Sequence, residues 1–419
     1  MLSLMTGRKR RRNCQYNTFL FTYLLILILN TMKKFIFSMA VLAAMVGTMT
    51  SCSNDEEVNS SNNAVVGKAI SFNVNNGSGT RALGTTPGNY LTQVQDFQVW
   101  GYYADGATGT GVTPGAQYVG VSNTVGIFMD GDGAGAWNYR TASDASYWPA
   151  ETAPLNFQAI TPASDASFTI ENTPSGNLAH VVANVTVPTD NAAQKDIMFA
   201  STPNQKASSN SRKVNLSFQH AMAQITFSAK QASTKFTAEV SGISINNIKS
   251  TGKVGYLAEN DAAGAVVLGG GADASMTVAN YATGMVADGT IDDIATAKPL
   301  TADDGALIML PQTTVKWATV DGTPVTVAEA DAAKNSYLVI TCKIKTTDGT
   351  YLVGSDSSFG TVYVPFAANW ERSKKYNYTI VFGTGTGGFD ADGNLIFQPI
   401  SYSASVEDWT PVDGGQLDS

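Results

Sequence analysis

The sequence has few of the residues on which metal sites and disulfide frameworks depend. It holds three cysteines and two histidines in 419 residues, namely Cys14, Cys52, Cys342, His180 and His220. The cysteines are too few and too differently placed for a disulfide framework or a CxxC site, and the histidines lack the HExxH spacing that binds zinc. We therefore expect no metal ion, and we interpret His220 as a satisfied, partly buried histidine.

Charge is also scarce, and the usual catalytic and nucleotide-binding motifs are missing. Only 14% of the residues are charged, and the formal net charge is -8. Beyond the first forty positions the basic residues are scattered, so no positive face is expected to bind nucleic acid. The chain has no GxSxG, no GxxxxGK[ST] and no Rossmann glycine pattern, so we expect neither a cofactor nor an enzyme. A catalytic pair of carboxylates for glycoside cleavage remains an open alternative, although the sequence points to no particular pair among its 34 acidic residues.

Long apolar runs are missing too, and the N-terminus instead has the pattern of a lipoprotein signal peptide. Met32 begins a basic start, the apolar stretch 35–46 follows, and small residues precede Cys52. The signal resembles a lipobox, which makes Cys52 the predicted site of lipid attachment, with palmitate-type acyl chains as the outer-membrane anchor. The alternative is that the apolar stretch is not cleaved off and remains as a helix that anchors the protein in the membrane. Residues 1–31 duplicate the signal pattern, so we interpret them as an upstream extension in an export segment of residues 1–51.

A polar, acidic stretch follows the lipid site, and we interpret residues 52–65 as a flexible tether. The acidic residues directly behind Cys52 resemble the signal that takes some lipoproteins to the outer face of the outer membrane. A merely solvated linker is the alternative.

Apolar and polar residues alternate with period two along the rest of the chain, which is typical of half-buried strands. Ile70, Phe72 and Val74 alternate with polar neighbours, and 39 glycines supply turns between such segments. We predict an all-β protein with two β-sandwich domains, at residues 66–212 and 213–419. The exception is a short helix near residues 327–334, and the Gly/Ala/Asp tracts at 264–275 and 287–298 are expected to be loops. Cys342 lies on the apolar phase of its strand and is expected in the core.

Two sets of residues allow a binding function but have a simpler interpretation. Stretches 130–133 and 390–393, each with two aspartates and at least one glycine, could offer oxygens to calcium, yet they lack the other ligands of an EF-hand loop and are typical of turns. Four tryptophans could stack on sugars if they were exposed, although most are expected to be core residues: Trp100, Trp137, Trp148 and Trp370.

A series of short motifs, in a fixed order behind a lipobox, resembles the fimbrillin-type lipoproteins that form type V pili in Bacteroides-type bacteria. The motifs are Cys52; Ile70–Phe72; Gly79–Ala82; Tyr147–Pro149; Leu155–Ala159; Asp196–Ala200; Phe218–Ala221; Ile225–Phe227; Trp370; Lys375–Tyr378; and Trp409. The resemblance implies two transthyretin-like β-sandwich domains and a non-enzymatic subunit of the cell surface or fimbrium. Its partners would be other fimbrial subunits and a host or bacterial surface ligand.

The resemblance also implies a proteolytic cut by a trypsin-like protease, here after Arg81 and before Ala82. The cut would remove the first strand, with Ile70, Phe72 and Val74, and open a groove for a strand of another subunit. We take the alternating residues near the C-terminus as the candidate donor strand: Ile400, Tyr402, Ala404 and Val406. Three alternatives remain open: an uncut, exposed Arg81; a tip or anchor subunit that keeps its lipid; and a surface glycan-binding lipoprotein for nutrient capture.

Overall fold

The computed structural model describes residues 69–74, 94–131, 136–149, 153–172, 181–208, 213–256, 268–274, 277–317, 319–320 and 323–409. All of them belong to one compact unit, Val65–Ser419. The signal peptide, Cys52, the tether, Arg81, Ala82 and the last ten residues lie outside the described residues. Within them, no helix has the length and apolar character needed to cross a membrane.

The regular secondary structure of the described residues is almost entirely β-strand, which confirms the all-β prediction. One α-helix is present among these residues, α2 (Val327–Ala332), where the sequence predicted it. Thr326 caps this helix: its hydroxyl accepts the amide of Glu329, and the Glu329 side chain accepts the amide of Thr326, so two otherwise unpaired donors are satisfied.

The first large sheet lies between residues 96 and 220. Its strand order is β11 (Gln219–His220), β9 (Met198–Gln205), β6 (Leu155–Thr161), β2 (Asp96–Tyr103), β4 (Ile127–Gly131) and β5 (Trp137–Tyr139), and β3 (Gln117–Val119) pairs with β2. A separate two-stranded parallel sheet joins β1 (Ser71–Val74) to β10 (Lys213–Leu216). Side chains from the two sheets form one core cluster, which includes Phe72, Phe97 and Leu216.

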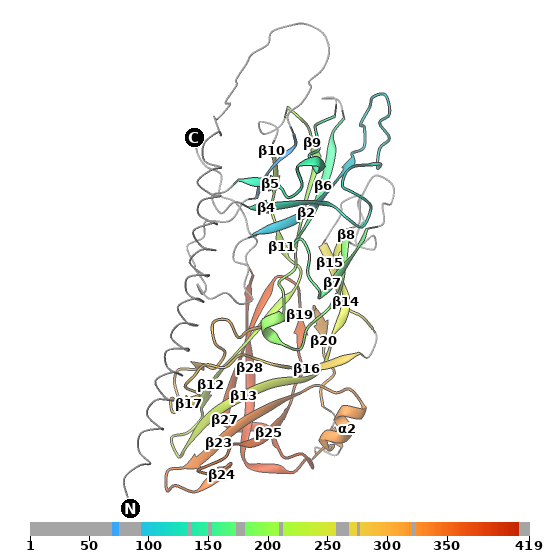
Figure 1. Ribbon diagram of the computed structural model, residues 1–419. Coiled ribbons are helices and arrows are strands. Elements are labelled where there is room, and N and C mark those ends of the chain that lie inside the picture. The colour runs from blue at the N-terminus through green and yellow to red at the C-terminus, as the bar shows by residue number, and fades with distance from the viewer. Residues whose placement is uncertain are drawn as a thin grey trace, which may run out of the picture. The chain divides into compact units, whose positions relative to one another are not determined.

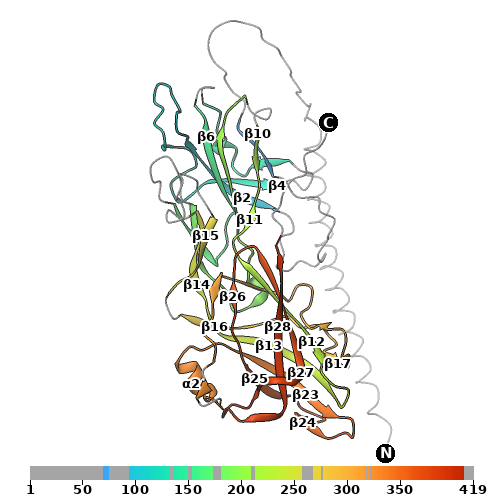
Figure 2. The ribbon, with the colours of Figure 1, turned by 180° about the vertical axis from the view of Figure 1, so that it is seen from behind.

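The second large sheet carries the C-terminal half of the chain. Its main strand order is β16 (Val278–Ala282), β13 (Phe236–Lys249), β23 (Tyr337–Thr346), β25 (Gly360–Pro365), β27 (Lys374–Phe389), β12 (Ala223–Gln231) and β18 (Lys298–Pro299). Four more strands pair beside this path: β17 (Thr290–Ile291), β19 (Leu307–Met309), β24 (Tyr351–Val353) and β28 (Leu395–Asp408). In both views β28 runs beside β27 (Figures 1 and 2).

This sheet supplies both sides of a sandwich core. β25 and β27 pair through Tyr363 and Phe389, and buried side chains from β23 and β25, such as Ile340 and Val362, share one cluster with Ile380 of β27. Cys342 is fully buried in the same cluster, as the alternation predicted. The sandwich interpretation of the fold is therefore confirmed for this half of the chain.

Smaller sheets complete the fold and correct one expectation. β15 (Leu268–Ala272), β14 (Thr251–Tyr256), β8 (Val181–Thr186) and β7 (Phe168–Asn172) form a four-stranded sheet; β20 (Gln312–Thr313) pairs with β26 (Asn369–Trp370), and β21 (Thr319–Val320) with β22 (Thr323–Pro324). The tract 264–275 was therefore not only a loop, because it contains β15, and the tract 287–298 contains β17. The division of the fold at residues 212 and 213 stays a prediction.

Candidate functional site: the first strand and its groove

β1 packs into the core of residues 94–220, and we call the core side chains and backbone groups that contact it the groove of β1. It runs parallel to β10 with Ser71 opposite Lys213 and Phe72 opposite Val214. Ile70, Phe72 and Val74 are 0%, 5% and 6% exposed, whereas the residues between them are half-buried. The alternation in the sequence therefore predicted the buried face of this strand. Burial of three such side chains contributes roughly 1.5–3 kcal/mol each, so β1 is strongly held.

An aromatic box holds the middle of β1. The Phe72 ring meets the rings of Phe97 and Phe157 edge to face, each at a centroid distance of 5.7 Å. Phe218 contacts Phe97 at 5.8 Å, and Trp148 contacts Phe157 at 5.9 Å, so further rings support the two walls. Edge-to-face pairs of this kind stabilise beyond the area that they bury, which makes the box selective for an aromatic ring.

A two-point clamp holds the start of β1 through its backbone. The amide of Ile70 donates to the carbonyl oxygen of Ser146 at 2.7 Å, and the Tyr139 hydroxyl donates to the carbonyl oxygen of Ile70 at 2.6 Å. Next to them, Ala69 forms an antiparallel bridge with Tyr147. Burial raises the pKa of Tyr139 to about 12, so its hydroxyl remains a donor at neutral pH. The clamp contacts only the backbone of residue 70, and the core around the Ile70 side chain accounts for the burial of that side chain.

The candidate donor strand is β28, which is paired with β27 in its own molecule. Ile400 is 1% exposed and belongs to the core, and the half-buried Tyr402 packs against that core. Ala404 and Val406 are on the same face but are exposed, Val406 to 52%. The alternating apolar residues of β28 thus continue past the point where the strand packs on its own core, so that Ala404 and Val406 face solvent.

A buried polar cluster that sequence reasoning missed lies at the end of β28. The Trp409 ring stacks on His220 with centroids 4.0 Å apart, and His220 Nδ1 lies 2.5 Å from a carboxylate oxygen of Asp196. His220 and Asp196 are 3% and 1% exposed, and the second Asp196 oxygen has no partner among the described residues. The amide of Trp409 also donates to the Ser373 carbonyl oxygen. The expected satisfied His220 is thus more buried than predicted, and it holds the C-terminal end of β28.

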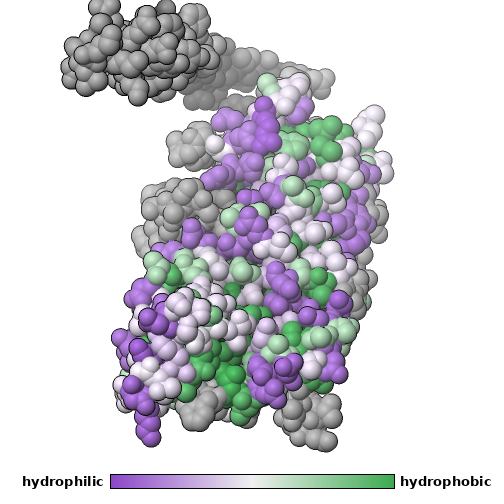
Figure 3. Space-filling model, turned by 60° about the horizontal axis from the view of Figure 1, so that its bottom comes forward, coloured by the Kyte–Doolittle hydropathy of each residue, from purple (hydrophilic) through white to green (hydrophobic). Residues whose placement is uncertain are grey.

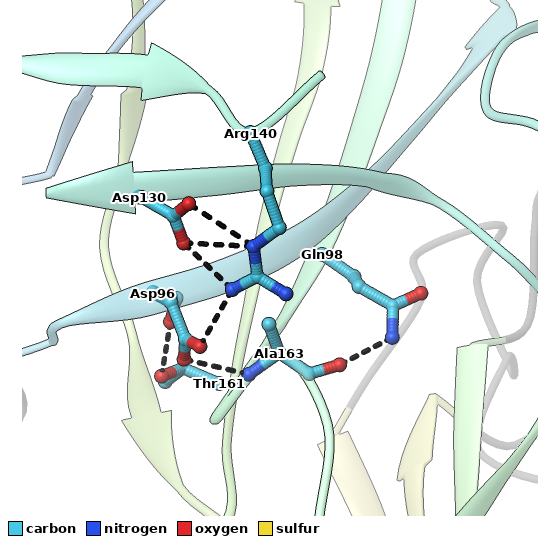
Figure 4. A network of polar contacts seen from close by, with 6 residues as sticks. All are labelled: Asp96, Gln98, Asp130, Arg140, Thr161 and Ala163. Atoms are coloured by element: carbon cyan, nitrogen blue, oxygen red, sulfur yellow. Dashed lines mark hydrogen bonds and ion pairs between the residues drawn. The ribbon is translucent and has the colours of Figure 1, made fainter. Parts of the chain in front are cut away.

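Asp130 and Asp390, which begin the two stretches that could offer oxygens to calcium, have other partners, whereas Asp132 lies outside the described residues. Arg140 Nη2 contacts Asp130 at 2.6 Å and Asp96 at 3.0 Å, as Figure 4 shows. Asp390 accepts the amides of Asp392 and Asn394, which is the geometry of a turn. In the part of the chain that the structure describes, no group of three or more acidic, histidine or cysteine side chains gathers as a metal site would require.

The tryptophans considered for sugar stacking are mostly core residues. Trp100, Trp148 and Trp370 are buried, and the half-buried Trp137 packs on Phe97 with centroids 4.9 Å apart. Among the described aromatic side chains, the exposed ones are Tyr147 and Phe359, at 50% and 37%. Figure 3 shows one face of the molecule, on which hydrophobic residues are interspersed with hydrophilic ones. The tryptophans therefore do not provide the open platform that glycan stacking needs.

Comparisons with known proteins identify the family of the chain. No protein with curated annotation matches the chain. A fimbrial protein from Bacteroides vulgatus is 16% identical, with a TM-score of 0.53, over 82% of this chain and 99% of that one. The tip fimbrial protein Mfa3 from Porphyromonas gingivalis is 9% identical, with a TM-score of 0.34, over 76% of this chain and 95% of that one. The fimbrillin-like family matches residues 80–409. Because that match spans most of the chain, the protein belongs to the fimbrillin-like family.

Proposed function

We propose that the protein is a non-enzymatic fimbrial subunit or adhesin of the cell surface that assembles by strand exchange. Membership of the fimbrillin-like family supports the surface role. The observation that carries the assembly step is β1, a short apolar strand seated in a groove and followed in sequence by Arg81. Lipid attachment at Cys52 would anchor the chain in the outer membrane before assembly.

Removal of β1 would leave a groove that cannot stay empty in water. Its walls include Phe97, Phe157 and Leu216, each fully buried while β1 is present. The edge of β10 would lose its backbone partners, the Tyr139 hydroxyl would lose the Ile70 carbonyl oxygen, and the Ser146 carbonyl oxygen would lose the Ile70 amide. Unpaired strand edges beside apolar surface bind further strands readily. A strand from a second copy would restore both kinds of contact.

A cut after Arg81 would separate β1 from the rest of the sandwich. The family match begins at residue 80, beside this bond, and leaves β1 outside it. The same cut would detach the subunit from the lipid at Cys52, so anchoring and assembly become alternative states of one chain. A tip or anchor subunit would keep β1 and its lipid.

The test is the N-terminus and mass of the protein on its native cells, with and without an arginine-specific protease inhibitor. Strand exchange predicts chains that begin at Ala82, found in high-mass ladders that disappear with the inhibitor. An acylated monomer that begins at Cys52 under both conditions would exclude assembly by this route. Binding of polysaccharides by that monomer in a glycan array would then favour a glycan-binding lipoprotein.

A further inference from the structure

β28 leaves one long edge open in the described part of the fold. The strand has 14 residues, and among the described strands β27 is its one partner in the sheet. Other strands that end a sheet path have two to five residues each: β5, β7, β11, β15, β16 and β18. An open edge offers unpaired amides and carbonyl oxygens to a further strand, so the outer edge of β28 is a candidate interface.

The exposed half of this edge lacks the features that commonly keep strand edges apart. Natural edges are interrupted by bulges, prolines or lysines. Residues 403–408 read Ser-Ala-Ser-Val-Glu-Asp, and their register with β27 is regular, because its shifts lie beyond Phe382. On one face of this segment Ala404 and Val406 are exposed. The segment itself therefore presents no obstacle to a further strand.

One hydrogen bond shows which backbone groups point to the open edge. The amide of Trp409 donates to the carbonyl oxygen of Ser373 at 2.7 Å, so these opposite residues form a hydrogen-bonded pair. In an antiparallel ladder such pairs alternate with non-hydrogen-bonded ones. Ala404, Val406 and Asp408 therefore turn their amides and carbonyl oxygens away from β27, and the residues between them use theirs in the ladder with β27.

The exposed segment matches itself about a two-fold axis at Ser405. Two antiparallel copies in this register put Ala404 of each copy opposite Val406 of the other, and the outward backbone groups of these residues meet. A shift of one residue would set these groups against groups that β27 already uses. An axis at Ala404 would pair residues 406–408 with residues 400–402, whose side chains are already packed in their own copy.

The acidic residues near the end of β28 favour the same register. With the axis at Ser405, Glu407 lies opposite Ser403, and the two copies of Glu407 are about 13 Å apart. The two copies of Asp408 are about 20 Å apart. An axis at Val406 would bring the two Glu407 residues to about 7 Å, where their like charges repel.

We propose that two copies of the chain pair through the outer edges of β28, antiparallel and about a two-fold axis at Ser405. A second copy is the occupant because the directions of the backbone groups, the apolar residues and the charges of the segment all match in this register. The contact keeps β28 in its own sandwich beside β27 and does not involve β1. It is therefore independent of the strand exchange proposed above, and it would join whole subunits side by side.

A single cysteine on the axis tests the pairing. In the proposed register the two copies of residue 405 form a non-hydrogen-bonded pair with Cα atoms about 4.5 Å apart, which a disulfide can span. One strand pair is smaller than the interface of a stable complex, so the dimer is captured by oxidation and read on a non-reducing gel. Ser405→Cys in the full, uncut chain should form covalent dimers.

The matched control is Ser403→Cys, which lies on the same face of β28. Its two copies would be about 13 Å apart, so we expect at least ten-fold fewer dimers than for Ser405→Cys. A mixture of the Ser403→Cys and Glu407→Cys proteins should cross-link again, because these positions face each other. All variants also carry Cys14→Ser and Cys52→Ser, and the native Cys342 is fully buried.

Val406→Pro, added to Ser405→Cys, tests the edge itself. The amide of Val406 points away from β27, so proline leaves the ladder with β27 intact and removes a donor of the proposed pair. We expect at least ten-fold fewer dimers, while urea unfolding shows that the variant is folded.

Dimers of Ser405→Cys that Val406→Pro suppresses would support the pairing. A mixture of Ser403→Cys and Ser405→Cys that cross-links best would overturn the proposed register. Equal cross-linking of the two single variants would overturn the pairing of two copies, and so would its absence from every variant, as when another segment of the same chain covers the edge. No cut is made, so these outcomes are distinct from a failure of strand exchange.

Discussion

At the scale of single residues, the Tyr139 hydroxyl is the contact that holds the buried carbonyl of Ile70. Tyr139→Phe removes this donor and keeps the ring, so we expect the uncleaved protein to lose about 1–3 kcal/mol of unfolding free energy. Urea unfolding measures the loss. Tyr351→Phe is the control, because its hydroxyl bonds an exposed Asp356 at 3.3 Å, and we expect a change within about 0.5 kcal/mol. Equal effects of the two variants would show that the clamp does not hold β1.

Cys342 gives a prediction about pH. Burial raises the pKa of its thiol from 9.0 to about 12, so the folded state favours the neutral form. Its contribution to stability is complete below pH 9 and falls between about pH 9 and 12, where the thiol of the unfolded chain ionises first. We expect no alkylation of Cys342 by iodoacetamide at pH 8.5 in the folded protein and full alkylation in urea, followed at this residue by peptide mass spectrometry. Rapid labelling without urea would contradict the burial of this side chain.

Single residues also show which parts of the site the sequence could reveal. Period-two alternation identified Ile70, Phe72 and Val74 because each strand turns alternate side chains to the core. The cluster of Asp196, His220 and Trp409 could not be found in this way, because its members belong to segments far apart in the chain. The alternation put His220 on a buried face, but only the tertiary fold supplies its carboxylate partner and the ring that covers it.

At the scale of elements, β15 shows why a glycine-rich tract was taken for a loop. Glycine has a low strand propensity, yet here it allows two backbones to approach. A Cβ at Gly270 would lie 2.1 Å from the Lys253 carbonyl oxygen of β14, and one at Gly252 would lie 2.3 Å from the Gly271 oxygen. The strand is specified by its neighbour and not by its own composition.

This close approach predicts the effect of a glycine substitution. Gly270→Ala combines an unfavourable positive φ with a backbone clash, so we expect a loss of about 2–4 kcal/mol in urea unfolding. Gly349→Ala is the matched control: its φ of +97° is similar to the +94° of Gly270, but its Cβ would have 3.8 Å to the nearest atom. For Gly349→Ala we expect a loss of about 1 kcal/mol of unfolding free energy. If the two variants lost equal stability, the positive φ alone would explain the need for glycine at position 270, and the close approach of β14 would not.

The far end of β28 is expected to depend on the Trp409 stack. Ser403, Ala404 and Val406 are exposed, so this half of the strand is held by β27 and by the stack of Trp409 on His220. Trp409→Ala should raise amide hydrogen exchange over residues 403–408 at least ten-fold. Trp137→Ala, which alters the core around Phe97 instead, should leave this exchange unchanged. A Trp409→Ala protein with unchanged exchange would show that β27 holds the strand alone.

At the scale of the whole molecule, the sequence predicted the fold class better than the pairing of its strands. Alternating segments, scarce charge and abundant glycine point to an all-β chain, because these features depend on local geometry. The parallel pairing of β1 with β10, and of β12 with β27, joins segments far apart in sequence. Such pairings depend on the tertiary fold, so alternation alone could not assign the partner of β1.

The most direct test of strand exchange is the mass of the particles that the purified full chain forms after an arginine-specific protease has cut it after Arg81. We expect the cleaved chain to form polymers and an Arg81→Ala protein to form none. An excess of a synthetic peptide of residues 66–78 should suppress the polymers, and a scrambled peptide should not. Cleaved chains that remain monomeric, or polymers that the peptide does not affect, would contradict assembly through the groove of β1.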